Sequence, residues 1–176
     1  FKIQGIITGG GQEFGLRSGT ENVSSIVGFA KAVEIALSIK HRESRRITEI
    51  RDYFWRGLKK IYPKAEVNGM MNDELRIKKS RSNSIIHNSK FTLPNILNIY
   101  FPDYSAQDLL AKFDLAGIAV SGGSACRTRA VSPSYTIEAL GYSEERAENS
   151  IRFSFGRPTA KKEIDKALKI IRKLLK

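Results

Sequence analysis

The feature that most constrains the fold is a helical pattern of apolar residues that runs from Glu21 to Tyr62. Its apolar side chains recur at three- and four-residue spacing, which places them on one face of an α-helix. Pro63 cannot continue a helix and ends the pattern. We therefore expect one long helix with a bend or break between Ser38 and Arg45. The apolar positions are Val23, Ile26, Val27, Ala30, Val33, Leu37, Ile47, Ile50, Phe54, Leu58 and Ile61.

The polar face of the second half of this helix is rich in arginine and lysine. Acidic residues are interspersed with the basic ones, so we interpret this face as a solvated helix surface rather than a binding stripe. The chain of 176 residues carries 30 Lys or Arg and 18 Asp or Glu, a net charge of +12. Clustered cations attract phosphates, but composition alone does not establish nucleic-acid binding. The basic residues of the face are Arg42, Arg45, Arg46, Arg51, Arg56 and Lys59.

Short strands and helices alternate after the long helix. β-branched and aromatic residues predict the longer strands, and Thr159 is a candidate N-cap for the closing helix. This alternation indicates an α/β or α+β domain, a small sheet with helices packed on it, entered by the long bent helix. Strands are expected at 65–69, 94–102, 117–121 and 150–155, and helices at 106–114, 133–141 and from 160 to the C-terminus.

Composition and cysteine count narrow the class of protein. With 41% hydrophobic and 27% charged residues, the chain has ordinary globular composition and can bury a real core. No apolar run approaches the ~18 residues of a membrane span, and the N-terminus lacks a signal-peptide layout, so we expect a cytoplasmic protein. The single cysteine, Cys126, excludes an intrachain disulfide and a zinc site of several thiolates. His41 and His87 lack partners at metal-ligand spacing, so no metal site is predicted.

The segment from about 70 to 92 is polar and basic, and we expect it to be an exposed loop. It contains no aromatic residue between Arg76 and Lys90, which argues against the base stacking that single-stranded nucleic acids require. A nucleic-acid-binding role for this loop is therefore a weak alternative.

Five glycines fall within eleven residues between Gly9 and Gly19, just before the long helix. Such a loop offers backbone N–H groups and a favourable helix dipole to an anion, and Ser18 and Thr20 add hydroxyl groups. We expect phosphate as the ligand. The loop matches neither GxxxxGK[ST] nor GxGxxG, so binding of a nucleoside triphosphate or dinucleotide is not predicted. We place a domain boundary near Thr20.

Two other residues are candidates for chemistry. Cys126 lies in SGGSACRTR, where glycines free the backbone and two arginines favour a thiolate by lowering the thiol pKa. The alternative is a small buried core cysteine. Arg152 lies between apolar neighbours in SIRFSFGR, so we expect its side chain on the opposite face of the strand, where it needs a carboxylate or solvent. The alternative is an ordinary surface arginine on an edge strand.

Three stretches together resemble one family. They are GGGQEFGLRSGTENVSSIVGFAKAVEIA, AVSGGSAC with PSYTIEALG, and SIRFSFGRPTAKKEIDKAL. They look like the C-terminal part of the cysteine desulfurases, pyridoxal-phosphate enzymes of the class V aminotransferase group that feed iron–sulfur cluster assembly. PNILNIYFP and VNG fit in the same order. The resemblance implies that 1–20 ends the large cofactor-binding domain, and that 21–176 forms the linking helix and the small domain of a PLP-dependent transferase fold.

The resemblance also implies a role for each candidate residue. Cys126 matches the nucleophilic cysteine that becomes a persulfide, and Arg152 matches the arginine that binds the substrate carboxylate. Thr20 matches the residue that reaches the phosphate of pyridoxal 5'-phosphate in the partner subunit of a homodimer. The complete enzyme converts L-cysteine to L-alanine and passes the sulfur to an iron–sulfur scaffold or another acceptor protein.

The sequence departs from the family at one decisive place. Family members carry the Schiff-base lysine in a Ser/Thr-x-His-Lys motif, and neither histidine of this chain is followed by lysine. We therefore expect this chain alone to be inactive. Smaller departures are Thr8, Phe14 and Gly122, where the family often has histidine, arginine and serine. One alternative stays open: a stand-alone sulfur carrier or partner-binding module that uses Cys126 without the cofactor.

Overall fold

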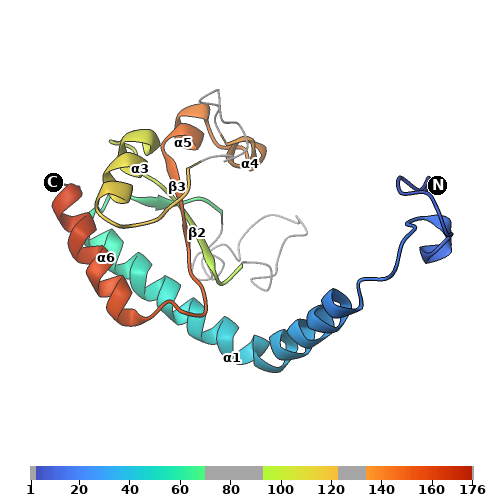
Figure 1. Cartoon of the computed structure of the whole chain (residues 1–176). Coiled ribbons are helices and arrows are strands. Elements are labelled where there is room, and N and C mark those ends of the chain that lie inside the picture. The colour runs from blue at the N-terminus through green and yellow to red at the C-terminus, as the bar shows by residue number, and fades with distance from the viewer. Residues whose placement is uncertain (1–2, 70–92, 123–133, 176) are drawn as a thin grey trace, which may run out of the picture. The chain divides into compact units, whose positions relative to one another are not determined.

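A computed structural model describes residues 3–69, 93–122 and 134–175 of the chain (Figure 1). The predicted basic loop at 70–92 and the segment that contains Cys126 thus lie outside the described residues. The elements in chain order are the 3-10 turn η1 (Glu13–Gly15), α1 (Val23–Ile61), β1 (Glu66–Val67), β2 (Ile96–Tyr100), α3 (Ala106–Leu115), α4 (Tyr135–Ala139), α5 (Glu144–Glu148), β3 (Ser150–Ser154) and α6 (Lys161–Leu174).

The predicted long helix is confirmed as α1, and it runs without a break through 38–45, where a bend or break was expected. Contacts within the chain define two compact units, Phe1–His41 and Arg42–Lys176, whose boundary falls inside that stretch. The first half of α1 groups with the glycine-rich loop, and its apolar side chains are exposed. The division into domains 1–20 and 21–176 stays a prediction.

The second unit is built on a three-stranded antiparallel sheet with the order β1-β2-β3. The register places Leu97 opposite Phe153 and Ile99 opposite Ile151, and all four side chains are buried. Figure 1 shows the second half of α1 and α6 side by side, and residues of both helices belong to the same core cluster as the strands. The predicted small sheet flanked by helices is confirmed.

Aromatic packing joins α1 to the sheet. The ring of Phe54 lies 4.8 Å from that of Phe153 and 5.6 Å from that of Phe155, measured between centroids. Phe113 of α3 approaches Phe153 from another side, at 6.2 Å. Such pairs add to the burial of apolar area, so these rings anchor both helices to β3.

The arginine-rich face of α1 is more than the solvated surface expected from the sequence. Arg51 is only 4% exposed and pairs with Asp52 at 2.8 Å. The guanidinium of Arg46 donates hydrogen bonds to three carbonyls in the turn before α6. The planar fork of arginine suits this task because it can satisfy several carbonyls that a turn leaves unpaired. Those carbonyls belong to Gly156, Arg157 and Thr159.

The N-cap of α6 is Ala160 rather than the predicted Thr159. The backbone N–H of Ala160 donates to the carboxylate of Glu163 at 2.8 Å, which satisfies the first turn of the helix. The hydroxyl of Thr159 instead accepts a hydrogen bond from the N–H of Gly156 at 2.9 Å.

The strand expected at 117–121 is reduced to one isolated bridge between Ser121 and Arg152. Gly117 has φ +79 and follows the C-cap of α3, and its N–H and that of Ile118 donate back to carbonyls of α3. This is a Schellman motif, which turns the chain sharply at the helix end. The motif redirects the chain at Gly117, and only Ser121 forms a backbone bridge with β3 in the described part of this segment.

The C-terminus of α1 is fixed to the turn after β2 through Tyr62. Its hydroxyl donates to a carboxylate oxygen of Asp103 at 2.7 Å, and Lys64 pairs with the same carboxylate at 2.9 Å. Burial of the ring, together with the hydrogen bond to Asp103, raises the pKa of Tyr62 to about 12. The hydrogen bond from Lys64 lowers the pKa of Asp103.

We predict that Gly57→Val destabilises the second unit. A Cβ at Gly57 would lie 2.3 Å from Cδ1 of Leu168 in α6, so the two helices approach closely only because this position is glycine. Overpacking of this kind costs about 1–3 kcal/mol. Urea unfolding measures the loss, and Gly28→Val is the matched control because a Cβ there meets no atom within 4 Å. Equal effects of the two substitutions would contradict the prediction.

The second prediction concerns alkaline pH. The unfolded tyrosine has a pKa of 10.0 and folded Tyr62 one of about 12, so the unfolded state holds fewer protons between these values. The contribution of Tyr62 to the free energy of unfolding is complete below about pH 10 and falls as the pH rises toward 12. Chemical unfolding at several pH values should show a shallower decline for Tyr62→Phe than for the unmodified chain. Identical slopes would refute this assignment.

Candidate functional site

The three predicted site residues do not all lie in one described part of the chain. Thr20 belongs to the first compact unit and Arg152 to the second. Cys126 lies outside the described residues. Two local sites can therefore be described, one around Thr20 and one around Arg152.

The glycine-rich loop folds back on itself. Ile7 and Arg17 form a parallel bridge, and the amide of Gly19 donates to the side-chain oxygen of Gln12 at 3.1 Å. Ser18 is buried, and its hydroxyl accepts a hydrogen bond from the amide of Gly11 at 3.4 Å. Ser18 therefore supports the loop from within, whereas the sequence indicated a hydroxyl that faces a ligand.

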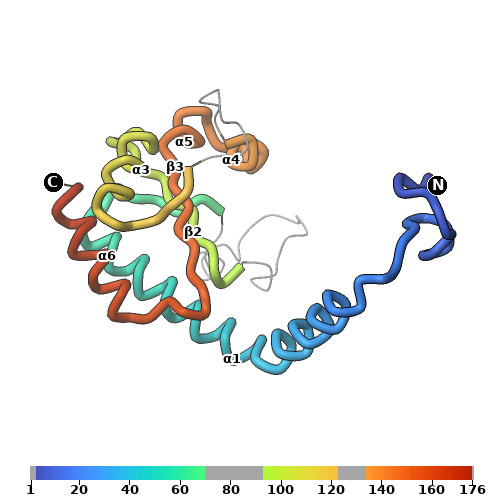
Figure 2. Tube along the Cα trace, in the orientation of Figure 1, coloured from blue at the N-terminus to red at the C-terminus, as the bar shows by residue number. Residues whose placement is uncertain are grey.

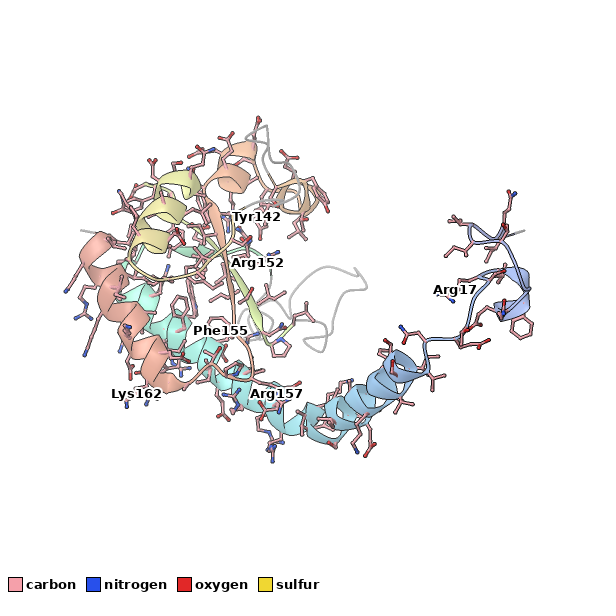
Figure 3. The ribbon with its side chains drawn as sticks, viewed as in Figure 1. Arg17, Tyr142, Arg152, Phe155, Arg157 and Lys162 are labelled. Atoms are coloured by element: carbon pink, nitrogen blue, oxygen red, sulfur yellow. The ribbon has the colours of Figure 1, made fainter. Side chains whose placement is uncertain are left out.

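Thr20 lies between a guanidinium and a helix N-terminus. Nη1 of Arg17 donates to the carbonyls of Gly19 and Thr20 at 3.2 and 3.1 Å, and Figure 3 labels this arginine. Thr20 is exposed, and its hydroxyl has no hydrogen-bond partner within the described part of the chain. α1 begins three residues later, capped by the side chain of Asn22, which accepts from the amide of Ser25 at 3.2 Å.

This geometry suits a phosphate. Arg17 brings a fixed positive charge, the helix N-terminus adds the positive end of its dipole, and Thr20 offers a free hydroxyl. The hydroxyl of Thr20 was expected from the sequence, whereas the contribution of Arg17 was not. The sequence does hold a clue to this contribution, because a basic residue stands three positions before Thr20. In the folded loop Arg17 lies beside Thr20.

Arg152 is exposed on β3 between two buried neighbours, as predicted from the alternation. Its backbone forms both hydrogen bonds of the bridge with Ser121, at 2.7 and 3.1 Å. Its Nη2 also donates to the hydroxyl of Ser121 at 3.3 Å (Figure 3). No acidic partner of Arg152 is found within the described ranges. Most of its five N–H donors thus stay available to a planar anion.

Ser121 is the positioning contact that the sequence argument missed. It fixes the backbone of Arg152 through two hydrogen bonds and its guanidinium through a third. A signal existed in the sequence, because the strand predicted at 117–121 ends at this serine. Its partner strand was not identifiable from local pattern.

A polar network covers the outer face of the sheet beside Arg152. Asn68 donates to the side chain of Asn98 at 2.6 Å and to that of Ser150 at 2.7 Å. Asn98 is the cross-strand partner of Arg152 in the register. This network gives Asn68, the middle residue of the VNG motif, a defined role in ordering the face on which Arg152 lies.

Arg146 of α5 ties that network to the helices. It donates to the side chain of Asn68 at 2.6 Å, and its guanidinium lies 4.2 Å from the ring centroid of Tyr142 and 5.0 Å from that of Tyr100. It also pairs with Glu66 of β1. Cation–π contacts and hydrogen bonds together hold β1, β2 and α5 in place.

The described residues provide neither a cluster of metal ligands nor a helix suited to span a membrane. No group of three histidine, cysteine, aspartate or glutamate side chains lies close enough to hold a metal ion within them. None of the described helices combines the length and apolar character needed to cross a bilayer. The cytoplasmic location stays a prediction of the sequence.

Comparison with known proteins identifies the relatives of this chain. The family model Aminotransferase class-V matches residues 7–167. A protein named cysteine desulfurase IscS from Dictyoglomus turgidum (strain DSM 6724 / Z-1310) is 36% identical over 174 residues, which are 99% of this chain and 40% of that protein. One of the same name from Serratia proteamaculans (strain 568) is 37% identical over 172 residues, 98% of this chain and 37% of that protein.

Solved structures agree with this assignment. The NifS-like protein from Rickettsia africae ESF-5 superposes with a TM-score of 0.72 at 29% identity, over 99% of this chain and 41% of its own. A second NifS-like protein gives a TM-score of 0.71. The chain spans about two fifths of the length of these relatives. With the family match over residues 7–167, the chain belongs to the class-V aminotransferase family.

Proposed function

We propose that this chain is the C-terminal portion of a cysteine desulfurase, an enzyme that takes sulfur from L-cysteine, leaves L-alanine and passes the sulfur to an acceptor protein. The observation that carries the proposal is the match of 98–99% of the chain to proteins named cysteine desulfurase IscS. The local geometry at Arg152 and Thr20 supports it, because each presents the groups that the proposed role needs.

Arg152 is proposed to bind the carboxylate of L-cysteine. A guanidinium with free donors in a planar fork pairs with a carboxylate through two parallel hydrogen bonds, which fixes orientation as well as position. Ser121 holds one edge of the guanidinium and leaves the other edge toward solvent. The substrate would thus be held by its carboxylate while its thiol stays free to react.

Cys126 is proposed as the nucleophile. Its thiolate attacks the substrate sulfur, an S–S bond forms, and the C–S bond of the substrate breaks. The electron pair of that bond stays with the former β-carbon, which takes up a proton to give L-alanine, and Cys126 is left as a persulfide. The two neighbouring arginines in the sequence favour the thiolate form that this attack requires.

Pyridoxal 5'-phosphate, when bound, supplies the electron sink for this cleavage. The described residues fit one part of that cofactor, since Arg17, Thr20 and the N-terminus of α1 together suit its phosphate. The chain contains no Ser/Thr-x-His-Lys motif for the Schiff-base lysine. We therefore propose that the active form is a larger protein and a homodimer, in which Thr20 contacts the cofactor phosphate of the partner subunit.

A chimera tests this function. The part of the Dictyoglomus turgidum protein that matches this chain is replaced by this chain, and production of alanine from L-cysteine is measured together with persulfide by mass spectrometry. We expect both products. Cys126→Ser in the chimera should abolish the persulfide and leave the visible absorption of the bound cofactor unchanged, because the thiolate acts on sulfur and not on the cofactor site.

Two results of this experiment would overturn the proposal. Alanine production by Cys126→Ser equal to that of the parent chimera would exclude Cys126 as nucleophile. A persulfide formed on the isolated chain with an added sulfur donor, alongside an inactive chimera, would favour a stand-alone sulfur carrier.

The fourth prediction, tested in the same chimera, compares the contribution of Arg152 with that of Ser121, which positions it. Losing a charge-assisted pair in a binding site costs about 2–4 kcal/mol, so Arg152→Ala should raise KM by about 30- to 1000-fold. Ser121→Ala removes a single hydroxyl contact worth about 0.5–1.5 kcal/mol and should raise KM by about 2- to 10-fold. Gln107→Ala, on the exposed side of α3, is the control. An unchanged KM for Arg152→Ala would rule out carboxylate binding by this residue.

A further inference from the structure

Four polar side chains lie in a row across the outer face of the sheet. The register pairs Asn98 of β2 directly with Arg152 of β3, and these two strands lie side by side (Figure 2). Asn68 continues the ladder of β1 with β2, since its N–H donates to the carbonyl of Asn98 at 2.9 Å. Ser121 pairs with Arg152 from the other side. Directly paired residues point to the same face of a sheet, so these four side chains lie next to one another.

An obligate donor at one end of the row fixes the direction of its hydrogen bonds. Nε of Arg146 carries a hydrogen and cannot accept, so the atom of Asn68 that it meets at 2.6 Å is the amide oxygen. The NH2 group of Asn68 therefore faces the other way and donates to Asn98 at 2.6 Å. The atom of Asn98 that accepts this bond is its oxygen, which leaves the NH2 group of Asn98 as a donor.

The other neutral side chains of the row have no donor left. Asn68 has two N–H groups and uses both, one on Asn98 and one on Ser150. The hydroxyl of Ser121 accepts from Arg152 and donates its single proton to the carbonyl of Gly122 at 3.2 Å. Within the row, only Asn98 keeps neutral N–H donors that reach no acceptor among the described residues.

The amide nitrogen of Asn98 lies on the side of β2 that faces Arg152. A carboxamide holds its nitrogen and its oxygen at two different edges of one plane. The oxygen of Asn98 faces β1, so the nitrogen faces away from β1 and toward β3. The Cβ atoms of directly opposed residues are about 4.5–5.5 Å apart. Asn98 is partly exposed and Arg152 is exposed, so the two neighbouring donors are both open to an anion.

We propose that Asn98 is a second donor to the carboxylate that Arg152 binds. Arg146 and Asn68 are positioning residues, because they keep the NH2 group of Asn98 turned toward that carboxylate. This role rests on the proposed function, in which the carboxylate belongs to L-cysteine. Two parallel hydrogen bonds from a guanidinium leave a carboxylate free to swing about the line through its oxygens. A carboxylate has further lone pairs, so a third donor from the neighbouring strand stops that swing and fixes the orientation of the substrate.

Binding is tested by NMR on the full chain, with propanoate as the carboxylate probe and propanamide as its uncharged counterpart. The titration follows two side-chain signals, the NH2 group of Asn98 and the Nε–H of Arg152. We expect both signals to shift with propanoate and to give one common dissociation constant, and neither to shift with propanamide. The measurement needs no cofactor and does not depend on the activity of the complete enzyme.

Two substitutions test the donor itself. Asn98→Ala removes it and should weaken propanoate binding at Arg152 about tenfold, since a hydrogen bond to a charged group is stronger than one between neutral groups. Asn98→Asp keeps an oxygen that accepts from Asn68 but places a negative charge beside Arg152, and should weaken binding further. Ser154→Ala is the matched control, because it shortens another polar side chain on the same face of β3, and it should bind like the parent chain.

A third substitution tests the chain of hydrogen bonds that starts at Arg146. Asn68→Asp keeps the size of the side chain but offers only acceptors, so Asn98 should turn its NH2 group toward the new carboxylate and its oxygen toward Arg152. We expect propanoate binding to weaken about as much as in Asn98→Ala, and the Asn98 signal to stop responding to propanoate. A merely structural role of position 68 would lower the thermal stability and leave the dissociation constant of the folded chain unchanged.

Three outcomes would overturn the inference. If the Arg152 signal shifts with propanoate while the Asn98 signal stays fixed, Asn98 is not a donor to the anion, and carboxylate binding by Arg152 stands. Equal dissociation constants for the parent chain and Asn98→Ala would exclude Asn98 in the same way. If neither signal shifts, the proposed role of Arg152 in substrate binding fails together with that of Asn98.

Discussion

The antiparallel register of β3 against β2 is the constraint on which the rest of the second unit depends. It turns Ile151, Phe153 and Phe155 toward the core and leaves Arg152 and Ser154 on the opposite face. Because side chains alternate with a period of two, a slip by one residue would bury Arg152 and expose the phenylalanines that hold α1. The pairing of β3 with β2 therefore determines both the aromatic packing of Phe54 and the position of Arg152, the candidate substrate-binding residue.

The side of β3 away from β2 carries both Arg152 and the residue that positions it. Ser121 fixes Arg152 on this side of the strand. Ser121 is also the point from which the chain continues toward Cys126 in the sequence.

Local sequence signals predicted much of this unit. Periodicity indicated α1, β2, α3 and β3 within a few residues, and alternation placed Arg152 on the outer face. The signals failed where distant residues decide. Thr159 has the side chain of a typical N-cap, but its hydroxyl accepts a hydrogen bond from the N–H of Gly156 instead. Arg46, on the arginine-rich face of α1, binds the carbonyls of a turn more than a hundred residues away in the sequence. Likewise, the apolar run at 117–121 predicts a strand, but in the structure the helix-ending motif at Gly117 redirects the chain.

By itself the sequence determined the family resemblance, the candidate residues Thr20, Cys126 and Arg152, and the absence of the lysine motif from this chain, because residue types and their order suffice for each. Tertiary structure alone decided that Ser121 holds Arg152 and that Arg46 supports the turn before α6. Hydrogen bonds and cavities depend on distances between segments that are remote in the chain, and no local pattern records those distances.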